Sequence, residues 1–189
     1  MDEVPKNSIL LKGPKQIPTI TIFTDAAFDN ELKVGAWACY IRIGLKVIQS
    51  SRIIEVGTEN STEAERVGVA VVLWILNQKV DLGKYKLIIY CDNGAAARPV
   101  KLYNKTGNAK QQAKKQLKFY QTHIEPLLQK AKMVDIRYIK GHAARNKNFK
   151  LKDRHLVHDM VDRQAGLTLD EFRRKLEPSI PEKRSDSGS

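Results

Sequence analysis

The sequence predicts an α/β domain built on a mixed five-stranded sheet with helices on both faces. Three β-rich runs follow one another between residues 20 and 56 with short connections, which is the pattern of an antiparallel meander. Two further apolar runs alternate with helical segments, which favours parallel strands joined by helices. The length of 189 residues fits one domain, and no internal repeat is visible.

The first half of the chain supplies three strands, a helix and a fourth strand. Residues 20–28 (ITIFTDAAF) form the first expected strand, and the next two are expected at 35–48 and 51–56, with a turn near 44–46. The segment 61–80 begins with polar STEAER and continues as VGVAVVLWIL, which is too long for a strand and predicts a helix packed on the sheet. The short apolar run 85–92 (YKLIIYCD) is typical of a buried parallel strand.

The second half is expected to be mainly helical. A short helix is predicted at 93–103, although Pro99 interrupts it, and a long helical segment at 109–132. The run 133–139 (MVDIRYI) predicts the last strand, and two helices are expected at 153–165 and 170–176. The folded domain should therefore span 19–176, preceded by a proline-rich lead-in at 1–18 and followed by a disordered tail at 177–189.

Composition limits the partners and the compartment. The 33 Lys and Arg against 21 Asp and Glu give a net charge of +12, which favours a polyanionic partner such as nucleic acid. No apolar run approaches the roughly 20 residues that span a bilayer, so no membrane segment is expected. Cys39 and Cys91 lie in strand-like runs and predict buried thiols without a disulfide, as suits the cytoplasm or another reducing intracellular compartment. A monomer is expected.

Three acids stand at positions that the predicted topology brings near the sheet. Asp25 lies within the first strand, Glu65 in the first turn of the first long helix, and Asp92 at the end of the fourth strand. Each acid alone has a structural explanation, because Asp92 could cap the following segment and Thr62-x-x-Glu65 could form a capping box. Three such acids together favour a site for hard divalent cations, since a buried carboxylate is costly unless it is paired or holds a metal.

The ordered set of motifs resembles the ribonuclease H family over about residues 19–166. TDAA around Asp25, STEAER around Glu65, IIYCDNGAA around Asp92 and YIKGHA before a final Asp resemble that family's successive motifs. The resemblance implies a ribonuclease H-like fold of the RNase HI type and an endonuclease that cleaves the RNA strand of RNA–DNA hybrids, leaving 5′-phosphate products. It also implies a two-metal-ion mechanism with two Mg²⁺ ions, for which Mn²⁺ is expected to substitute, and with Asp25 bridging both ions.

The resemblance also implies a fourth acid and a histidine, both in the carboxyl-terminal part of the chain. VDRQA matches the family pattern at Asp162, while Asp159, one helical turn earlier, stays an alternative. The family usually has Asn where this chain has His158, and the stretch between His142 and Asp162 is longer than usual. The resemblance implies that His142 assists proton transfer or product release. The other three histidines (His123, His155 and His158) are expected to be structural or solvated.

A stretch of the chain that carries only positive charges predicts where the hybrid binds. Residues 98–118 contain seven Lys or Arg and no acid, which is unusual for a solvated helix face and indicates phosphate binding. The expected phosphate contacts are Lys101, Lys105, Lys110, Lys114, Lys115 and Lys118. Contacts that recognise the RNA strand are expected near Asn60, Ser61 and Asn93. A second basic patch in the loop 143–158 could close over the active site, touch the DNA strand or be simply solvated. Trp37 and Trp74 are expected in the core.

Two other classes of function compete with the hybrid nuclease. A resolvase-like or integrase-like nuclease would share the fold class, because a fold alone does not fix function. A non-catalytic nucleic-acid-binding module would also suit the charge. The compact domain with its KGHA motif disfavours the first alternative, and the presence of Asp25, Glu65 and Asp92 together disfavours the second, because such acids without a metal would only cost stability.

Overall fold

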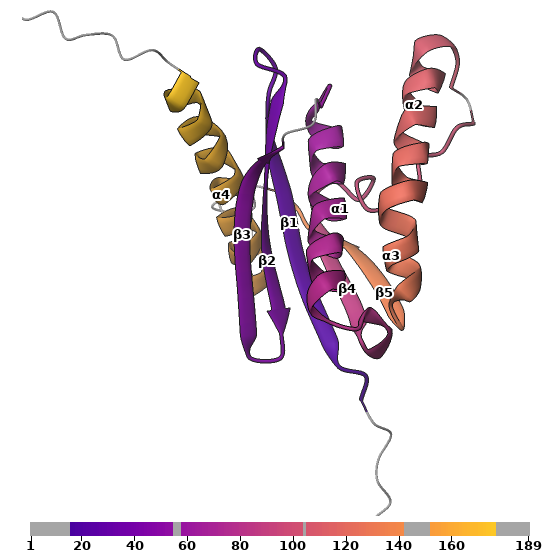
Figure 1. Cartoon of the computed structure of the whole chain (residues 1–189), viewed down its shortest axis with the longest axis vertical. Helices are drawn as coiled ribbons and strands as arrows, with labels where there is room; N and C mark the ends of the chain where they lie inside the picture. Colours follow the sequence, from indigo (N-terminus) through magenta and orange to yellow (C-terminus); the bar gives the residue numbers. More distant parts are fainter. Residues whose placement is uncertain (1–15, 55–57, 104, 142–151, 177–189) are drawn as a thin grey trace, which may run out of the picture.

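The computed structural model describes residues 16–54, 58–103, 105–141 and 152–176 and contains the predicted five-stranded sheet (Figure 1). Its strand order is β3-β2-β1-β4-β5. The antiparallel meander consists of β1 (Thr19–Asp29), β2 (Val34–Ile43) and β3 (Lys46–Ile54). Both β4 (Lys86–Cys91) and β5 (Met133–Tyr138) run parallel to β1. The predicted fold class is thereby confirmed.

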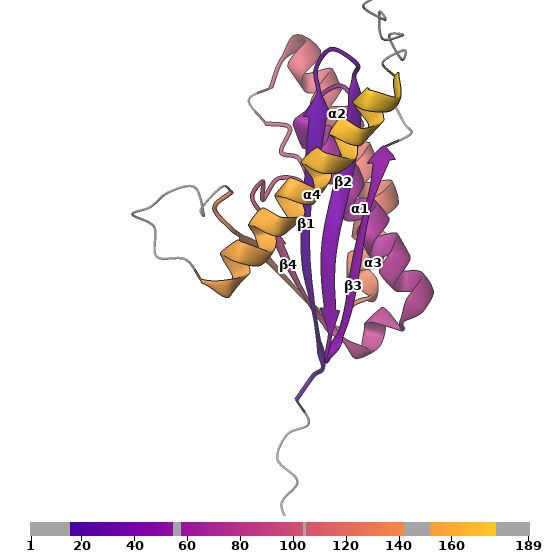
Figure 2. The same ribbon diagram turned by 90° about the vertical axis from the view of Figure 1, so that its left-hand side faces the viewer.

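Helices cover both faces of this sheet. One face carries α1 (Ser61–Lys79) and, beside it, the consecutive segments α2 (Gly107–Phe119), η2 (Tyr120–Ile124, a π-helical turn) and α3 (Glu125–Lys130) (Figure 1). The other face carries α4 (Asp153–Leu176), which crosses the strands obliquely (Figure 2). A 3₁₀ turn, η1 (Leu82–Lys84), connects α1 to β4. None of the helices in the described ranges is both long and apolar enough to cross a bilayer.

Small residues let α1 approach the sheet closely beside the first acid. A Cβ atom added to Gly68 would lie 3.2 Å from the Cβ of Trp37 and 3.9 Å from the backbone oxygen of Asp25. Ala64, one turn earlier, is fully buried. This close contact sets the amino-terminal turn of α1, which carries Glu65, against the strand that carries Asp25.

The two faces of the sheet bury separate cores. The larger core lies between the sheet and α1, η2 and α3, and it includes Ile22, Trp37, Leu73 and both cysteines. The smaller core lies between the sheet and α4, where the Phe23 and Tyr90 rings stack with centroids 4.7 Å apart. Since side chains alternate along a strand, residues two positions after these aromatics point to the same, α4-covered face.

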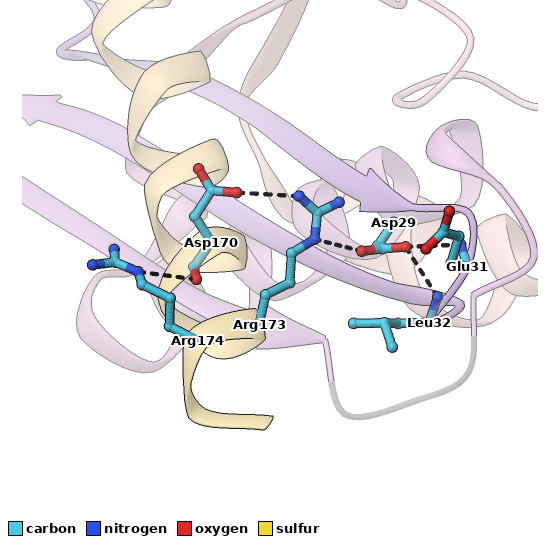
Figure 3. Close-up of polar contacts among 6 residues, drawn as sticks. All are labelled: Asp29, Glu31, Leu32, Asp170, Arg173 and Arg174. Atoms are coloured by element: carbon cyan, nitrogen blue, oxygen red, sulfur yellow. Dashed lines mark hydrogen bonds and ion pairs between the residues drawn. The ribbon is translucent and has the colours of Figure 1, made fainter. Parts of the chain in front are cut away.

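The carboxyl-terminal half of α4 is anchored to the end of β1. The guanidinium of Arg173 contacts the buried carboxylate of Asp29 and also donates to Asp170 at 3.2 Å (Figure 3). Asp29 accepts backbone N–H groups of Glu31 (2.8 Å) and Leu32 (3.0 Å) as well. The Leu32 N–H, together with Arg173, holds the pKa of Asp29 below its usual value. These contacts fix α4 over the sheet.

Two helix predictions are wrong. Residues 153–176 form one helix instead of two, because Val161, Ala165 and Leu169 make a buried stripe that continues past Gly166. Packing of that stripe outweighs the penalty of about 1 kcal/mol for an interior glycine. Residues 93–103 form turns instead of a short helix, and the side chain of Asn93 initiates the first turn by accepting the N–H of Ala95 at 3.1 Å.

Both cysteines and one of the two tryptophans lie in the core, as the sequence predicts. Cys39 and Cys91 are buried free thiols, and Trp37 is buried, all as predicted. Trp74 is 58% exposed, so its placement in the core is wrong. The predicted tail at 177–189 and most of the lead-in lie outside the described residues.

Candidate metal centre

Strand register brings Asp25 and Asp92 together. The parallel ladder of β1 and β4 ends at the pair Phe23–Tyr90, and each acid lies two residues beyond its member of that pair. Both carboxylates therefore stand where the two strands part, on the face covered by α4. Asp25 is 7% exposed, and one of its oxygens accepts the backbone N–H of Ala26 at 2.8 Å.

Neighbouring residues cap α1, which leaves Glu65 available for another role. The N-cap is Asn60, whose side-chain oxygen accepts the N–H of Glu63 at 3.0 Å, while Glu63 accepts the N–H of Glu59 at 2.9 Å. The capping box suggested for Thr62 and Glu65 is therefore not formed. Among the residues that the structure describes, the buried Oε2 atom of Glu65 has no hydrogen-bond partner.

The end of β4 is organised in a similar way around Asp92. The turn after the strand is made by Asn93, so Asp92 does not cap a helix. The Asn93 amide also donates to Thr62 Oγ1 at 3.4 Å, which links this turn to the first turn of α1. Three residues after β5, Gly141 packs against Asp92 so closely that an added Cβ would lie 2.6 Å from Asp92 Oδ2.

A buried arginine that the sequence analysis did not single out fastens the same turn. Arg66 is 2% exposed and donates from Nη2 to the carbonyl of Ala95 (2.8 Å) and from Nη1 to the carbonyl of Arg98 (3.1 Å). Arg98 in turn donates to the carbonyl of Ile136 in β5 at 3.1 Å. The helix that carries Glu65 is thus tied to the segment that follows Asp92.

Burial and mutual repulsion dominate the electrostatics of the acids. Burial raises the pKa of Asp25 to about 8, and the charges of Asp92, Asp162 and Glu65 add to the shift against the opposing Ala26 N–H. Burial and then Asp92 raise the pKa of Glu65 to about 7, although a hydrogen bond from Asn93 and the charge of Arg66 oppose this. A divalent cation would relieve both penalties, so the donor set and the orphaned Glu65 oxygen fit hard cations.

The two possible fourth acids behave differently. Asp162 contributes to the raised pKa of Asp25, which places its charge near the cluster. The charge of Asp159 acts on His155: burial lowers the pKa of that histidine, and Asp159 opposes the shift. Asp162 therefore stays the proposed fourth acid, with Asp159 as the alternative.

One histidine that the sequence analysis left as structural or solvated lies within the cluster. His158 is fully buried on α4, and one of its ring nitrogens and one oxygen each from Asp25 and Asp92 all lie within 4.8 Å of one another. Two signals in the sequence could have revealed it: its position one helical turn before Asp162, and its place where the ribonuclease H family usually has Asn. His142, the histidine that the sequence analysis selected, lies outside the described residues.

The predicted nucleic-acid contacts are exposed lysines of α2 and of the segment before it, together with polar residues near the start of α1. All six lysines of the basic stretch are exposed, and Lys115 forms an ion pair with Glu59 at 3.7 Å. A groove of about 400 Å³ between α1 and α2 is lined by Thr58, Arg66, Lys115 and other residues. Ser61 is exposed, whereas Asn60 and Asn93 use their side chains in the cap and the turn. Residues 143–151 of the second basic patch lie outside the described part of the chain.

The arrangement of strands and helices defines a ribonuclease H-like fold. Solved RNase H structures share it: RNase H1 of Halobacterium salinarum is 13% identical, with a TM-score of 0.52 over 81% of this chain and 98% of that chain. LC9-RNase H1, a type 1 RNase H with the type 2 active-site motif, is 11% identical, with a TM-score of 0.58 over 82% and 74%. LC11-RNase H1, solved in complex with an RNA/DNA hybrid, is 14% identical, with a TM-score of 0.50 over 82% and 99%. No protein-family model and no curated protein sequence matches the chain.

Proposed function

We propose that this protein is a divalent-metal-dependent endonuclease that cleaves the RNA strand of RNA–DNA hybrids. The observation that carries the proposal is the meeting of Asp25 and Asp92 at the end of their strand ladder, with the charges of Glu65 and Asp162 acting on the same point. Within a ribonuclease H-like fold, such a set of acids is suited to hydrolysis of a phosphodiester.

The acids would hold two Mg²⁺ ions, with Mn²⁺ as a substitute. Asp25, the most buried of the four, would contact both ions, and Glu65, Asp92 and Asp162 would complete their surroundings. When bound, such ions supply Lewis-acid activation of water and of the phosphoryl oxygens. Turns fastened by Asn93 and Arg66 hold the carboxylates in place, so little reorganisation is needed when the substrate arrives.

The rest of the substrate would be positioned by charge. Exposed lysines of α2 and of the segment before it present positive charge beside the helix that carries Glu65, which suits a nucleic-acid backbone. A structural neighbour with the same fold, LC11-RNase H1, was solved with an RNA/DNA hybrid, which supports this substrate class. His142 is proposed to assist proton transfer or product release.

The test is cleavage of a labelled RNA–DNA hybrid with Mg²⁺ or Mn²⁺, in parallel with duplex RNA, duplex DNA and a four-way junction. We expect the hybrid to be cut and the RNA products to carry 5′-phosphates. Asp25→Asn and Asp92→Asn should abolish cleavage while the hybrid still binds. The matched control is Asp135→Asn, since Asp135 is an acid on β5 that pairs with Arg137 away from the cluster.

The other results of these cleavage and binding assays distinguish the alternative functions. Cleavage of the four-way junction alone would favour a resolvase-like nuclease, and binding without any cleavage would favour a non-catalytic module. Comparison of Asp159→Asn with Asp162→Asn assigns the fourth acid, because only the variant that removes a ligand should lose activity. Wild-type activity in Asp25→Asn would refute the site itself.

A further inference from the structure

His158 lies where a metal ligand would lie. It approaches Asp25 and Asp92 from α4, whereas the two acids come from the sheet. Asp25 and Asp92 project from β1 and from the end of β4 toward the face covered by α4. His158 comes from α4 itself, is fully buried, and brings a ring nitrogen within 4.8 Å of an oxygen of each acid. Two carboxylates and an imidazole therefore converge on one small volume.

The histidine sits on a rigid support. Near the start of α4, Nδ1 of His155 accepts the backbone N–H of Lys152 at 3.1 Å, and near its end Arg173 is bound to Asp29. Between these anchors, Val161 and Ala165 pack into the smaller core beside Phe23 and Tyr90. A side chain held in this way keeps its geometry, which is what a metal ligand requires.

A mixed donor set of oxygen and nitrogen does not treat all divalent cations alike. Mg²⁺ prefers oxygen ligands in octahedral geometry and gains little from an imidazole. First-row transition cations accept imidazole nitrogen readily, with an affinity that rises across the series from Mn²⁺. Glu65 and Asp162 add negative charge around the cluster. Because negative charge attracts any divalent cation, it does not decide between Mg²⁺ and a transition cation.

We propose that His158 is a direct metal ligand and that it makes this centre bind first-row transition cations in preference to Mg²⁺. The inference rests on the metal centre of the proposed function, although it requires no hydrolysis. It deepens that function by assigning the cation class to one side chain, which occupies the place where the ribonuclease H family usually has Asn.

Pulsed electron paramagnetic resonance of Mn²⁺ bound to the full chain tests the ligand directly. We expect a nitrogen coupling on the bound Mn²⁺ that changes when the protein is made with ¹⁵N-labelled histidine. This measurement uses the unmodified sequence, so it does not depend on whether a variant folds. If bound Mn²⁺ shows no coupling to histidine nitrogen, the imidazole only hydrogen-bonds to the carboxylates and the proposal is wrong.

Calorimetric titrations test the preference. His158→Asn should weaken Mn²⁺ binding by about tenfold or more, the scale on which residues that support a metal act, and change Mg²⁺ binding far less. His123→Asn, which removes an exposed histidine on η2, is the control and should leave both affinities unchanged. Equal losses for the two cations, or none, would overturn the proposal. Because these readouts involve no substrate, a protein that binds Mn²⁺ through His158 but cuts no hybrid would refute only the proposed function.

Discussion

Gly141→Ala is the sharpest test of how the metal centre is built. The Cβ atom added at this position would lie 2.6 Å from Asp92 Oδ2, 3.3 Å from its Cβ and 3.4 Å from its Cγ. The oxygen would have to move by about 0.8 Å to reach an ordinary contact of 3.4 Å. A misplacement near 1 Å in a catalytic group can cost about 100-fold in rate.

We therefore expect Gly141→Ala to lower kcat for hybrid cleavage by roughly 10- to 100-fold, with a modest loss of stability of about 1–3 kcal/mol from overpacking. Initial rates at saturating hybrid measure the first effect, and urea unfolding measures the second. Divalent-cation titrations should also show weaker binding, because the displaced oxygen belongs to a proposed ligand.

The matched control is Gly166→Ala on α4, where an added Cβ would have no atom of the described residues within 4 Å apart from its own helix backbone. That substitution should leave kcat unchanged and raise helix stability by up to about 1 kcal/mol. If Gly141→Ala keeps the turnover and cation affinity of the unmodified protein, then the contact with Asp92 does not position the carboxylate and the reasoning fails.

Three further outcomes are expected. Metal-free protein should lose stability as pH rises from about 4 to about 8, because native Asp25 keeps its proton after the unfolded chain has released it. Thermal unfolding in EDTA from pH 5 to 9 measures this loss. Asp25→Asn should make Tm less dependent on pH and should raise it. Arg66→Met should destabilise the fold by about 1–3 kcal/mol in urea unfolding, since two carbonyls of the turn after β4 lose their donor. Lys114→Ala and Lys118→Ala should each reduce the slope of log affinity for the hybrid against log salt by about one in EDTA, without changing kcat in Mg²⁺.

Each of these outcomes can fail on its own. A pH-independent Tm in EDTA would mean that Asp25 is not the buried, repelled acid of the structure. Unchanged stability of Arg66→Met would show that the turn holds without its guanidinium. Salt slopes that match the unmodified protein would remove the α2 lysines from the hybrid interface, and Lys84→Ala, on an exposed residue of η1, is the control for general charge loss.

The sequence by itself determined the order of the strands and the position of the first long helix, and it singled out the acids of the candidate site. Alternation along 20–28 and the long apolar pattern of 61–80 depend only on local periodicity, so β1 and α1 were predictable within a few residues. Asp25, Glu65 and Asp92 could be proposed from the sequence because charged residues at sheet-proximal positions are costly and their order resembles a known set of motifs.

Only the tertiary structure decided the features that depend on contacts between distant segments. Helix α4 runs through Gly166 because its buried stripe packs on the sheet, and that packing energy is absent from any local window. Arg66 is buried because the turn after β4 offers it two carbonyls, although an arginine in a helix is usually solvated. His158 joins the acids because α4 crosses the sheet where β1 and β4 part, and the crossing point of two elements far apart in the chain is fixed by packing and by no local sequence pattern.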